Sequence, residues 1–260
     1  MFFCQKKVKV SGCLIIIILK NKQLDIVLPC YNPRGEWIEE ILKAYRFLST
    51  ALPETNLRII LVNDGSPLSP DPEEIDTLQQ NIPSFDYISY PENQGKGYAL
   101  RKGVAQSKGD ICIYTDLDFP YTGESLVFLY RQLLQGEHDV VVGIKDESYY
   151  EKLPPFRVKV SRFLRFLIRT FLRLSISDTQ CGLKGFNKRG REIFLKTTIN
   201  RYLCDLEFIF LTERAPDIQM NPLQIQLREG VEFSKVDLRI LAREGLNFAA
   251  IFLRSLLGKG

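Results

Sequence analysis

The sequence predicts an α/β fold with a mostly parallel central sheet and helices on both of its faces. From residue 24 onward, short apolar runs alternate with longer amphipathic stretches, which is the pattern of strands joined by helices. The early runs are apolar at nearly every position, which is typical of strands that are buried on both faces. Such strands, each followed by a helix, indicate a parallel sheet that is covered on two sides.

The first half of the chain has a regular order of elements. Strands are predicted where compact apolar runs end in turn residues, and helices where apolar residues recur every three or four positions. The predicted strands cover residues 24–29, 58–63, 86–90 and 111–115. The predicted helices between them cover residues 36–52, 70–82 and 96–107.

The second half is less regular. A helix over 123–134 leads to a buried strand over 138–142, and a loop over 143–155 is closed by two prolines. The remaining elements are a long basic helix, a strand, a helix, a second strand and a terminal helix, over residues 156–174, 180–186, 202–213, 218–227 and 236–257.

Composition excludes several classes of protein. The 260 residues are 45% hydrophobic and 25% charged, with a formal net charge of +4, as in an ordinary soluble globular protein. The mild charge, without a basic stripe interleaved with aromatic residues, argues against a nucleic-acid partner. The six cysteines form no Cys-x-x-Cys pair, which argues against a zinc site or a disulfide scaffold and favours the reducing cytoplasm.

The N-terminus has three lysines before an apolar run at residues 10–19. The run is too short for a transmembrane helix, which needs about 20 apolar residues, and no small-residue cleavage site of a signal peptide follows it. We therefore predict an irregular or interfacial leader over 1–23, one α/β domain over 24–230 and a C-terminal amphipathic helix over 231–260.

Two aspartates, Asp116 and Asp118, directly follow the fourth predicted strand. Residues two apart in a strand point the same way, so both carboxylates should emerge together where the strand ends. Two carboxylates held close resist ionising unless a cation lies between them, and oxygen ligands of this kind suit Mg²⁺ or Mn²⁺. The alternative is a solvated acidic turn, since aspartate is common in loops.

Polar residues also follow the first two strands. Ligands gather beyond the carboxyl ends of parallel strands, so these residues should meet in one crevice. Pro29, Tyr31 and Asn32 offer a ring against which a base could stack, or else form a plain turn. Asp64 could accept hydrogen bonds from a nucleobase, although Asp-Gly-Ser-Pro is also an ordinary turn signature.

After the third strand, the segment from Asn93 to Gly97 opens a helix. Glycines such as Gly95 let backbone N–H groups approach an anion, and Lys96 adds positive charge, so the segment predicts a phosphate site. A tight connection with surface charge is the alternative. Neither a Walker A loop nor a Gly-x-Gly-x-x-Gly fingerprint is present.

In their order and spacing, the motifs at 29–32, 63–66, 93–97 and 116–118 resemble family 2 glycosyltransferases of the GT-A fold, whose sheet is Rossmann-like. Two later runs, Asp178 to Lys184 and Cys204 to Glu207, look like the dolichyl-phosphate glucosyltransferase and polyprenyl-phosphate mannosyltransferase branch. The similarity covers roughly residues 24–230, which would form the catalytic domain.

The resemblance implies a role for each matching residue. It places Asp116 and Asp118 at the metal and the diphosphate. Asp178 and Gln180, with Arg157 and Arg162 of the basic helix, would lie at the sugar and acceptor side. The residues implied at the nucleotide sugar, with Asp64 at its base, are Pro29, Tyr31, Asn32, Asp64, Asn93, Gly95, Lys96 and Asp116.

The chain departs from the family pattern in three places. Asn63 stands where many relatives have a further aspartate, and Pro33 where they have glutamate. Pro120 stands where mannosyltransferase relatives have a metal-binding glutamine. These departures leave the metal shell and a mannosyl donor open.

The resemblance also implies a candidate base. A lipid phosphate acceptor is anionic at pH 7 and needs no general base, whereas a hydroxyl acceptor does, and Asp205 holds a position that resembles one. The alternative for Asp205 and Glu207 is a place in the first turn of a helix, where acidic residues are favoured.

The helix predicted over 156–174 bears on the acceptor. Large apolar residues fill much of one side, and the basic stripe on the other consists of Arg162, Arg165, Arg169 and Arg173. A basic amphipathic helix suits the surface of an anionic membrane, where the last helix could join it. The alternative is a helix packed on the sheet with a solvated charged face.

From these observations and the resemblance we predict an inverting, metal-dependent glycosyltransferase, peripheral to the cytoplasmic face of a membrane. It would move a hexose from a nucleotide diphosphate sugar to polyprenyl or dolichyl phosphate, with Mg²⁺ or Mn²⁺ as cofactor. UDP-glucose is preferred as donor, and GDP-mannose stays open. The alternatives are transfer to a glycan hydroxyl in envelope polysaccharide synthesis and a non-catalytic nucleotide-sugar-binding subunit. A homo-oligomer or a membrane-protein partner stays open.

Overall fold

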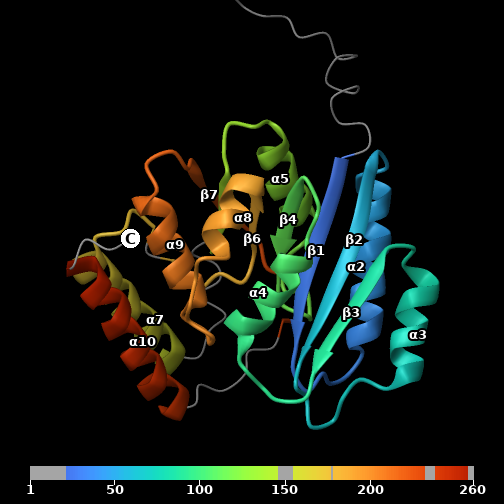
Figure 1. Cartoon of the computed structure of the whole chain (residues 1–260), viewed down its shortest axis with the longest axis horizontal. Coiled ribbons are helices and arrows are strands. Elements are labelled where there is room, and N and C mark those ends of the chain that lie inside the picture. Colours follow the sequence, from blue (N-terminus) through green and yellow to red (C-terminus); the bar gives the residue numbers. More distant parts are fainter. Residues whose placement is uncertain (1–21, 146–154, 177, 232–237, 257–260) are drawn as a thin grey trace, which may run out of the picture.

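The computed structural model describes residues 22–145, 155–176, 178–231 and 238–256. In these residues seven strands form one sheet in the order β3-β2-β1-β4-β6-β5-β7, with helices on both faces (Figure 1). The predicted α/β fold with a mostly parallel sheet is confirmed. The predicted leader lies outside the described residues, except for Lys22 and Gln23, which open the first strand.

The first half of the sheet is parallel, and each strand is joined to the next by a helix. Each of these elements lies within a few residues of its prediction. The strands are β1 (Lys22–Cys30), β2 (Thr55–Asp64), β3 (Phe85–Tyr90) and β4 (Ile111–Tyr114). The connecting helices are α2 (Trp37–Ala51), α3 (Pro72–Asn81) and α4 (Lys96–Gln106).

The second half of the sheet is built around an antiparallel strand. β6 (Lys184–Asn187) runs antiparallel to β4 on one side and to β5 (Val140–Lys145) on the other. β7 (Met220–Ile225) pairs in parallel with β5. The strand predicted over 180–186 therefore begins only at Lys184. The predicted loop at 143–155 is wrong at its start, because β5 continues to Lys145, and residues 146–154 lie outside the described part.

The helices of the second half include one that was not predicted, α8. The predicted basic helix is α-helical only to Leu167, continues as a short π-helical segment, and ends where Arg173 takes a left-handed φ of 54°. The elements are α5 (Gly123–Leu134), α7 (Pro155–Leu167), η1 (Ile168–Leu172), α8 (Lys188–Phe194), α9 (Cys204–Arg214) and α10 (Leu238–Leu256).

Local signals start several helices. α3 begins with a capping box between Asp71 and Glu74, followed by a proline at its first position. The Thr122 side chain accepts a hydrogen bond from an N–H group in the first turn of α5. The Asn187 side chain does the same for α8, so the residue that ends β6 also begins this helix.

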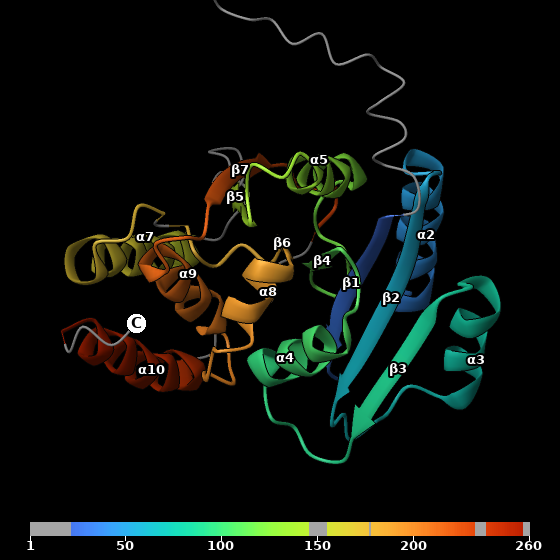
Figure 2. The same cartoon turned by 45° about the horizontal axis from the view of Figure 1, so that its top comes forward.

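Two apolar cores hold the layers together. On one face of the sheet, α2, α3 and α5 pack against strand residues such as Ile26 and Ile113. On the other face, α4, α8 and α9 pack against residues such as Val27 and Tyr114 (Figure 2). Because successive residues of a strand point to opposite faces, neighbours in β1 and β4 supply different cores.

α7, η1 and α10 lie together beside α9, at the end of the molecule away from β3 (Figure 1). Phe171 of η1 and Phe252 of α10 meet edge to face, with ring centroids 5.4 Å apart. Ile251 of α10 is buried in the second core, so the predicted C-terminal helix packs on the main domain. Within the described ranges, no helix has both the length and the apolar character needed to cross a bilayer.

Candidate functional site

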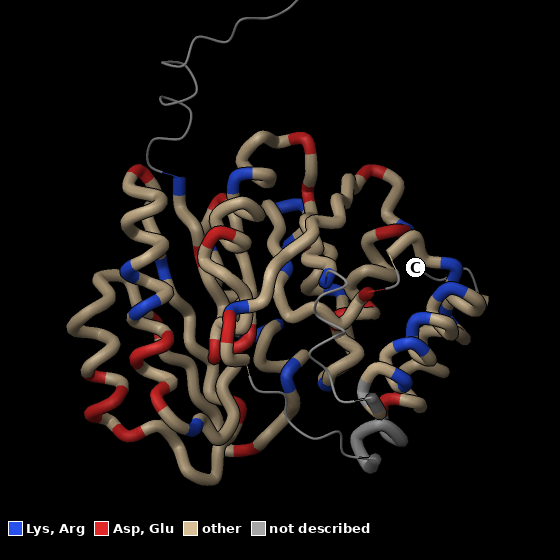
Figure 3. Tube along the Cα trace, turned by 180° about the vertical axis from the view of Figure 1, so that it is seen from behind, with Lys and Arg blue, Asp and Glu red and all other residues tan. Residues whose placement is uncertain are grey.

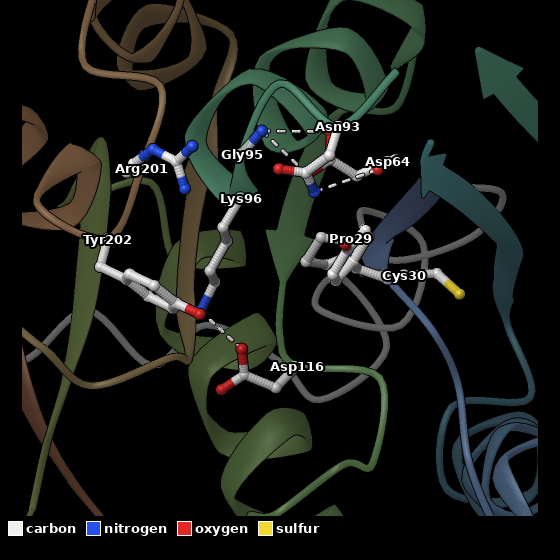
Figure 4. Close-up of a pocket in the computed structure, with 10 residues that line it drawn as sticks. Pro29, Cys30, Asp64, Asn93, Gly95, Lys96, Asp116, Arg201 and Tyr202 are labelled. Atoms are coloured by element: carbon white, nitrogen blue, oxygen red, sulfur yellow. Dashed lines mark hydrogen bonds and ion pairs between the residues drawn. The ribbon is translucent and has the colours of Figure 1, made fainter. Parts of the chain in front are cut away.

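A cavity of about 400 Å³ opens at the carboxyl ends of the first strands. Its walls come from the ends of β1 and β2, the segment after β3, the turn after β4 and the connection between α8 and α9 (Figure 4). The structure thus brings together residues predicted from all four strand ends. The lining residues are Pro29, Cys30, Tyr31, Asp64, Asn93, Gly95, Lys96, Asp116, Arg201 and Tyr202.

The carboxylate of Asp64 is bonded to the protein through both oxygens. Asp64 is 3% exposed and accepts hydrogen bonds at 2.8 Å from the Tyr90 hydroxyl and from the Asn93 side-chain amide. It also accepts them from the backbone N–H groups of Gln94, at 2.8 Å, and Gly95, at 2.9 Å. Burial and the hydrogen bond from its hydroxyl to Asp64 raise the pKa of Tyr90, so that hydroxyl remains a donor. Asp64 therefore fixes the segment after β3 against the end of β2.

The glycines at the start of α4 permit close packing of another segment. The N–H groups of Gly97 and of the next residue both donate to the carbonyl oxygen of Asn200, at 2.8 and 3.2 Å. A Cβ at Gly97 would overlap the carbonyl oxygen of Ile199, and one at Gly95, whose φ is 105°, would overlap that of Asn200. With the bonds to Asp64, these contacts occupy the N–H groups of residues 94, 95, 97 and 98. The predicted backbone cradle for a phosphate is therefore wrong there.

Lys96 keeps its positive charge in the cavity. Its Nζ lies 2.5 Å from Oδ1 of Asp116 (Figure 4). Burial lowers the pKa of Lys96, but the carboxylates of Asp116 and Asp205 outweigh burial and raise it above its usual range. The other oxygen of Asp116 faces Gly182, where a Cβ would overlap it. This part of the cavity is therefore a charged pair packed against a glycine.

Asp116 and Asp118 lie in a turn and not in the strand from which their common direction was predicted. β4 ends at Tyr114, and the N–H group of Phe119, whose φ is 42°, donates to the Asp116 carbonyl at 3.0 Å. Asp118 is exposed, and no other residue in the described part of the chain forms a hydrogen bond or an ion pair with its carboxylate. Partial burial of that carboxyl group and the Asp116 carboxylate raise the pKa of Asp118. A cation between the two would relieve this repulsion.

The same two aspartates are the residues that could hold a divalent metal. Residues 22–145, 155–176, 178–231 and 238–256 contain no group of three or more His, Cys, Asp or Glu that could do so. Mg²⁺ and Mn²⁺ take carboxylate oxygens and often complete their shells with water and phosphate oxygens. The pair therefore fits a metal that is shared with a bound phosphate.

Asp205, the predicted base, is buried in an ion pair. Its Oδ1 accepts hydrogen bonds from Lys184 Nζ at 2.5 Å and from the Tyr114 hydroxyl at 2.6 Å. Lys184 is 0% exposed and also donates to the Cys181 carbonyl at 2.5 Å. Burial raises the pKa of Asp205, but Lys184 and Lys96 outweigh burial and hold it below its usual range.

The base role of Asp205 stays a prediction that this geometry does not support. A general base must reach the proton that it accepts, whereas Asp205 lies outside the cavity lining and is engaged with Lys184 and Tyr114. The alternative of an acidic residue in the first turn of α9 is what the structure has. There Asp205 holds Lys184, which in turn holds the turn that ends at Gly182.

The other predicted residues lie outside the cavity lining. Asp178 and Gln180 contact Lys145 at the end of β5: the Lys145 N–H group donates to Asp178 at 2.8 Å and its Nζ to the Gln180 carbonyl at 3.2 Å. Arg162 is exposed on α7, and the side chain of Arg157 lies outside the described residues. The structure thus brings neither Asp178, Gln180 nor Arg162 to the cavity.

Of the first predicted group, Pro29 and Tyr31 line the cavity and Asn32 does not. Tyr31 is 50% exposed, so its ring is open to a ligand. Asn32 forms the turn, with a φ of 49° and an N–H group that donates to Ser66 Oγ at 2.8 Å. Of the two alternatives for this segment, the exposed ring applies to Tyr31 and the turn to Asn32.

Sequence reasoning missed three lining residues: Cys30, Arg201 and Tyr202. Burial, with Glu74 as a lesser cause, raises the pKa of the Cys30 thiol to about 12, so it stays protonated. Arg201 and Tyr202 belong to the connection between α8 and α9, because the helix predicted over 202–213 begins only at Cys204. The one available signal was a basic and an aromatic residue directly before the run at 204–207.

Comparisons with known proteins agree with the fold and the motifs. The family model described as Glycosyl transferase family 2 matches residues 25–194. The dolichyl-phosphate beta-glucosyltransferase ALG5A of Trichomonas vaginalis is 24% identical over 227 residues, which are 83% of this chain and 68% of that protein. The dolichyl-phosphate beta-glucosyltransferase of Drosophila melanogaster is 26% identical over 205 residues, 74% of this chain and 63% of that protein.

A third relative, glycosyltransferase AglD of Haloferax volcanii, is 26% identical over 196 residues, 74% of this chain and 31% of that protein. The chain thus spans about two thirds of the length of the two glucosyltransferases and about a third of AglD.

Solved structures share the fold. Mannosyl-3-phosphoglycerate synthase from Rubrobacter xylanophilus matches with a TM-score of 0.63 at 16% identity, covering 92% of this chain and 76% of that chain. Glucosyl-3-phosphoglycerate synthase from Mycobacterium tuberculosis, in complex with Mn²⁺, UDP-glucose and phosphoglyceric acid, matches with a TM-score of 0.61 at 19% identity, covering 90% and 79%. At such identities the likeness concerns the fold alone.

Proposed function

This chain belongs to glycosyl transferase family 2 and has the GT-A fold, and from that premise we propose that it transfers a hexose from a nucleotide diphosphate sugar to polyprenyl or dolichyl phosphate. The observation that carries the proposal is the pair of carboxylates, Asp116 and Asp118, beside Lys96 at the cavity. The names of the relatives, dolichyl-phosphate beta-glucosyltransferases, support glucose as the sugar and a lipid phosphate as the acceptor.

The donor lies along the cavity, with its base at Tyr31 and its diphosphate at Lys96 and Asp116. The exposed Tyr31 ring supports stacking by a base, while Asp64 keeps the neighbouring wall in place. Negative charge develops on the diphosphate as it leaves, and the charged Lys96 stabilises it. When bound at Asp116 and Asp118, a divalent metal such as Mg²⁺ or Mn²⁺ supplies further Lewis-acid stabilisation.

The acceptor is a phosphate that attacks the sugar directly. It is ionised at pH 7 and needs no general base, and the engagement of Asp205 in a buried ion pair supports such an acceptor over a hydroxyl. A single displacement on an α-linked nucleotide sugar gives the β-linked product that the names of the relatives contain. The reaction is therefore inverting.

A surface formed by α7, η1 and α10 supports a membrane-bound acceptor and a peripheral place at a membrane, for which we propose the cytoplasmic face. Lys and Arg recur along α7 and η1 (Figure 3), while the solvent side of these helices also carries large apolar residues that a simple packed helix would not expose. Such a mixture suits the membrane–water interface. The exposed apolar residues are Phe156, Phe163, Phe166, Phe171, Leu246, Leu253 and Leu256.

The test of the reaction uses the purified full chain with Mg²⁺ or Mn²⁺, a panel of UDP- and GDP-sugars, and polyprenyl phosphate. The expected product is a lipid-linked hexose, formed best from UDP-glucose and lost on chelation of the metal. Transfer to a saccharide hydroxyl with none to the lipid would contradict the acceptor. Nucleotide-sugar binding without turnover on any acceptor would contradict an enzyme.

The membrane surface has its own test, sedimentation with anionic liposomes. The double variant Phe163→Ser/Phe166→Ser removes two exposed rings from α7 and should bind about tenfold more weakly, since burying apolar side chains contributes to interfacial binding. Phe128→Ser removes an equally exposed ring from α5 and is the matched control. Equal binding of both variants would remove the interface from the proposal.

A further inference from the structure

We propose that Arg201 binds a phosphate group of the substrates, and that α10 positions Arg201 by holding the connection between α8 and α9. The proposal rests on the proposed function for the source of that phosphate, which is either the donor diphosphate or the lipid phosphate. Both sources offer the same chemistry, phosphate oxygens with negative charge.

Arg201 is the cation of the cavity that has no partner among the residues that the structure describes. Lys96 is paired with Asp116 at 2.5 Å. The Arg201 guanidinium lines the cavity and has neither a hydrogen bond nor an ion pair within the described ranges. A guanidinium is charged at every physiological pH, and its fork of N–H donors matches phosphate oxygens. An anionic ligand would supply what the described residues do not.

The place of Arg201 agrees with a phosphate. In Figure 4, Arg201 and Tyr202 lie on the opposite side of Lys96 from Pro29 and Cys30. A nucleotide whose base lies at the end of β1 would extend toward Lys96 with its phosphates. Arg201 then faces the phosphate end of the donor, where an attacking lipid phosphate also has to arrive.

The connection that carries Arg201 is fixed on one side to α4. The Asn200 carbonyl accepts hydrogen bonds from the Gly97 N–H group and from that of the following residue. The Arg101 guanidinium donates to the Ile199 carbonyl at 2.8 Å and to the Asn200 side chain. Because Gly95 and Gly97 have no Cβ, this segment can lie directly on the start of α4.

On its other side, the connection is attached to α10 at two points, Thr198 before Arg201 and Leu203 after it. The buried Glu207 of α9 joins Thr198 to α10, because it accepts hydrogen bonds from the Thr198 N–H group at 2.8 Å and from Arg254 Nη1 at 2.5 Å. Arg254 also donates to Thr198 Oγ1 at 2.9 Å. After Arg201, the Leu203 N–H group donates to Glu244 of α10 at 2.9 Å.

These bonds hold the backbone around Arg201 and leave its side chain to a ligand. A binding group that is held in place before the ligand arrives loses less entropy on binding, which is the effect expected of a positioned side chain. Arg254 is therefore a positioning residue, since it acts on the substrate only through Thr198 and Glu207.

The first experiment compares Arg201→Gln with Lys196→Gln in the full chain. Lys196 is exposed near the start of the same connection and outside the cavity lining, so its variant removes the same charge without the contact. Calorimetry with UDP and with GDP, in the presence of Mg²⁺, gives the dissociation constants, and steady-state kinetics give KM for each substrate. Arg201→Gln should weaken the affected substrate about tenfold or more, as expected for a lost charge-assisted hydrogen bond.

The outcome identifies the source of the phosphate. A higher dissociation constant for the nucleoside diphosphates, with a higher donor KM, assigns Arg201 to the donor. A higher acceptor KM with unchanged nucleotide binding assigns it to the lipid phosphate. Unchanged values for both substrates would overturn the proposal. Loss of nucleotide binding is measurable even if no lipid product forms, so this outcome stays separate from the fate of the proposed function.

The second experiment tests the attachment to α10. Arg254→Met should raise by about threefold to tenfold the dissociation constant or KM that Arg201→Gln raises. In the double variant it should add little, because both substitutions weaken the same contact between Arg201 and the phosphate. A merely structural role would give additive losses instead. Arg254→Lys, which keeps a donor for Glu207, should restore most of the affinity, and thermal melting checks that each variant is folded. Unaltered constants in Arg254→Met would overturn the role of α10.

Discussion

Two walls of the cavity differ in how far their polar groups are bonded within the protein. Around Asp64, both carboxylate oxygens and the N–H groups of the following segment have protein partners. Around the turn after β4 and the connection before α9, Asp118, just outside the lining, and Arg201 bond to no other residue in the described ranges through their side chains. Among these residues the first wall is complete without a ligand, whereas Asp118 and Arg201 are left for a ligand to bind.

This contrast separates the residues that give the site its shape from the residues that are available to bind a ligand. A buried carboxylate with several hydrogen bonds contributes to folding, because its removal leaves several donors unsatisfied. An exposed charge without a partner contributes little to folding, so its value lies in what it binds. Substitutions on the two walls should therefore separate stability from activity.

The largest expected effect is that of Asp118→Ala on turnover. Removing a group that stabilises developing charge costs roughly 10²–10³-fold in rate, while the free energy of unfolding should change by less than about 0.5 kcal/mol because the side chain is exposed. Asp76→Ala, at an exposed position in α3, is the control for loss of one carboxylate. A fully active Asp118→Ala enzyme would place Asp118 with the residues that only shape the site.

The next effect concerns Asp64→Ala, which should lower the free energy of unfolding by about 3 kcal/mol. The substitution leaves the buried N–H group of Gly95 and the half-buried Tyr90 hydroxyl without their acceptor, and an unsatisfied buried group costs about 1–3 kcal/mol. Urea denaturation followed by circular dichroism measures the loss. Asp64→Asn keeps one acceptor oxygen and should lose less. An unchanged denaturation midpoint would show that the first wall is not what holds this region together.

A smaller effect is expected where Gly182 meets Asp116. In Gly182→Ala the new methyl group would overlap the Asp116 carboxylate and displace it from Lys96. We expect a loss of about 1–3 kcal/mol in stability and a roughly tenfold loss in turnover. Gly245→Ala, in the interior of α10, meets no atom within 4 Å; it should leave turnover unchanged and raise stability by up to about 1 kcal/mol through helix propensity. Activity equal to that of the control would show that Asp116 tolerates displacement.

The smallest effect is a pH dependence from Asp205. Its folded pKa lies below its ordinary value of 3.8, so the stability that it contributes is present above about pH 4 and is lost as the pH falls through the folded pKa. The free energy of unfolding should therefore decrease more steeply below about pH 4 in the wild type than in Asp205→Asn. Denaturation curves at about pH 5, 4 and 3 give the two slopes. Equal slopes would mean that Asp205 is not charged in its pair with Lys184.

The parallel half of the fold could be predicted because its signals are local. β1 and β2 are compact apolar runs that end in turn residues, and α4 lies within one residue of its prediction at 96–107. The antiparallel β6 could not be predicted in the same way. It has four residues and begins with a lysine, whose burial depends on Asp205, 21 positions away.

The expectation that ligands gather beyond the carboxyl ends of the strands located most of the cavity, but not which of its residues are bonded within the protein. Asp64 was correctly placed at the crevice, yet its partners come from a segment about 30 positions later, which spacing does not reveal. Arg201 reaches the cavity only because Asn200 binds the start of α4. A family resemblance gives Asp205 a position but neither its burial nor its pairing with Lys184.

The strand β6 also limits when the central sheet can assemble during synthesis. Among the described residues, β5 pairs with β6 and β7, both of which follow it in the chain, and β6 is the strand that connects β5 to β4. A nascent chain that has emerged only as far as residue 183 therefore presents β4 with an open edge, which is the kind of surface that attracts wrong partners. The arrival of Lys184–Asn187 covers that edge and joins β5 to the sheet, so four residues late in the chain remove this risk of wrong pairing, and the outer edge of β5 then waits for β7.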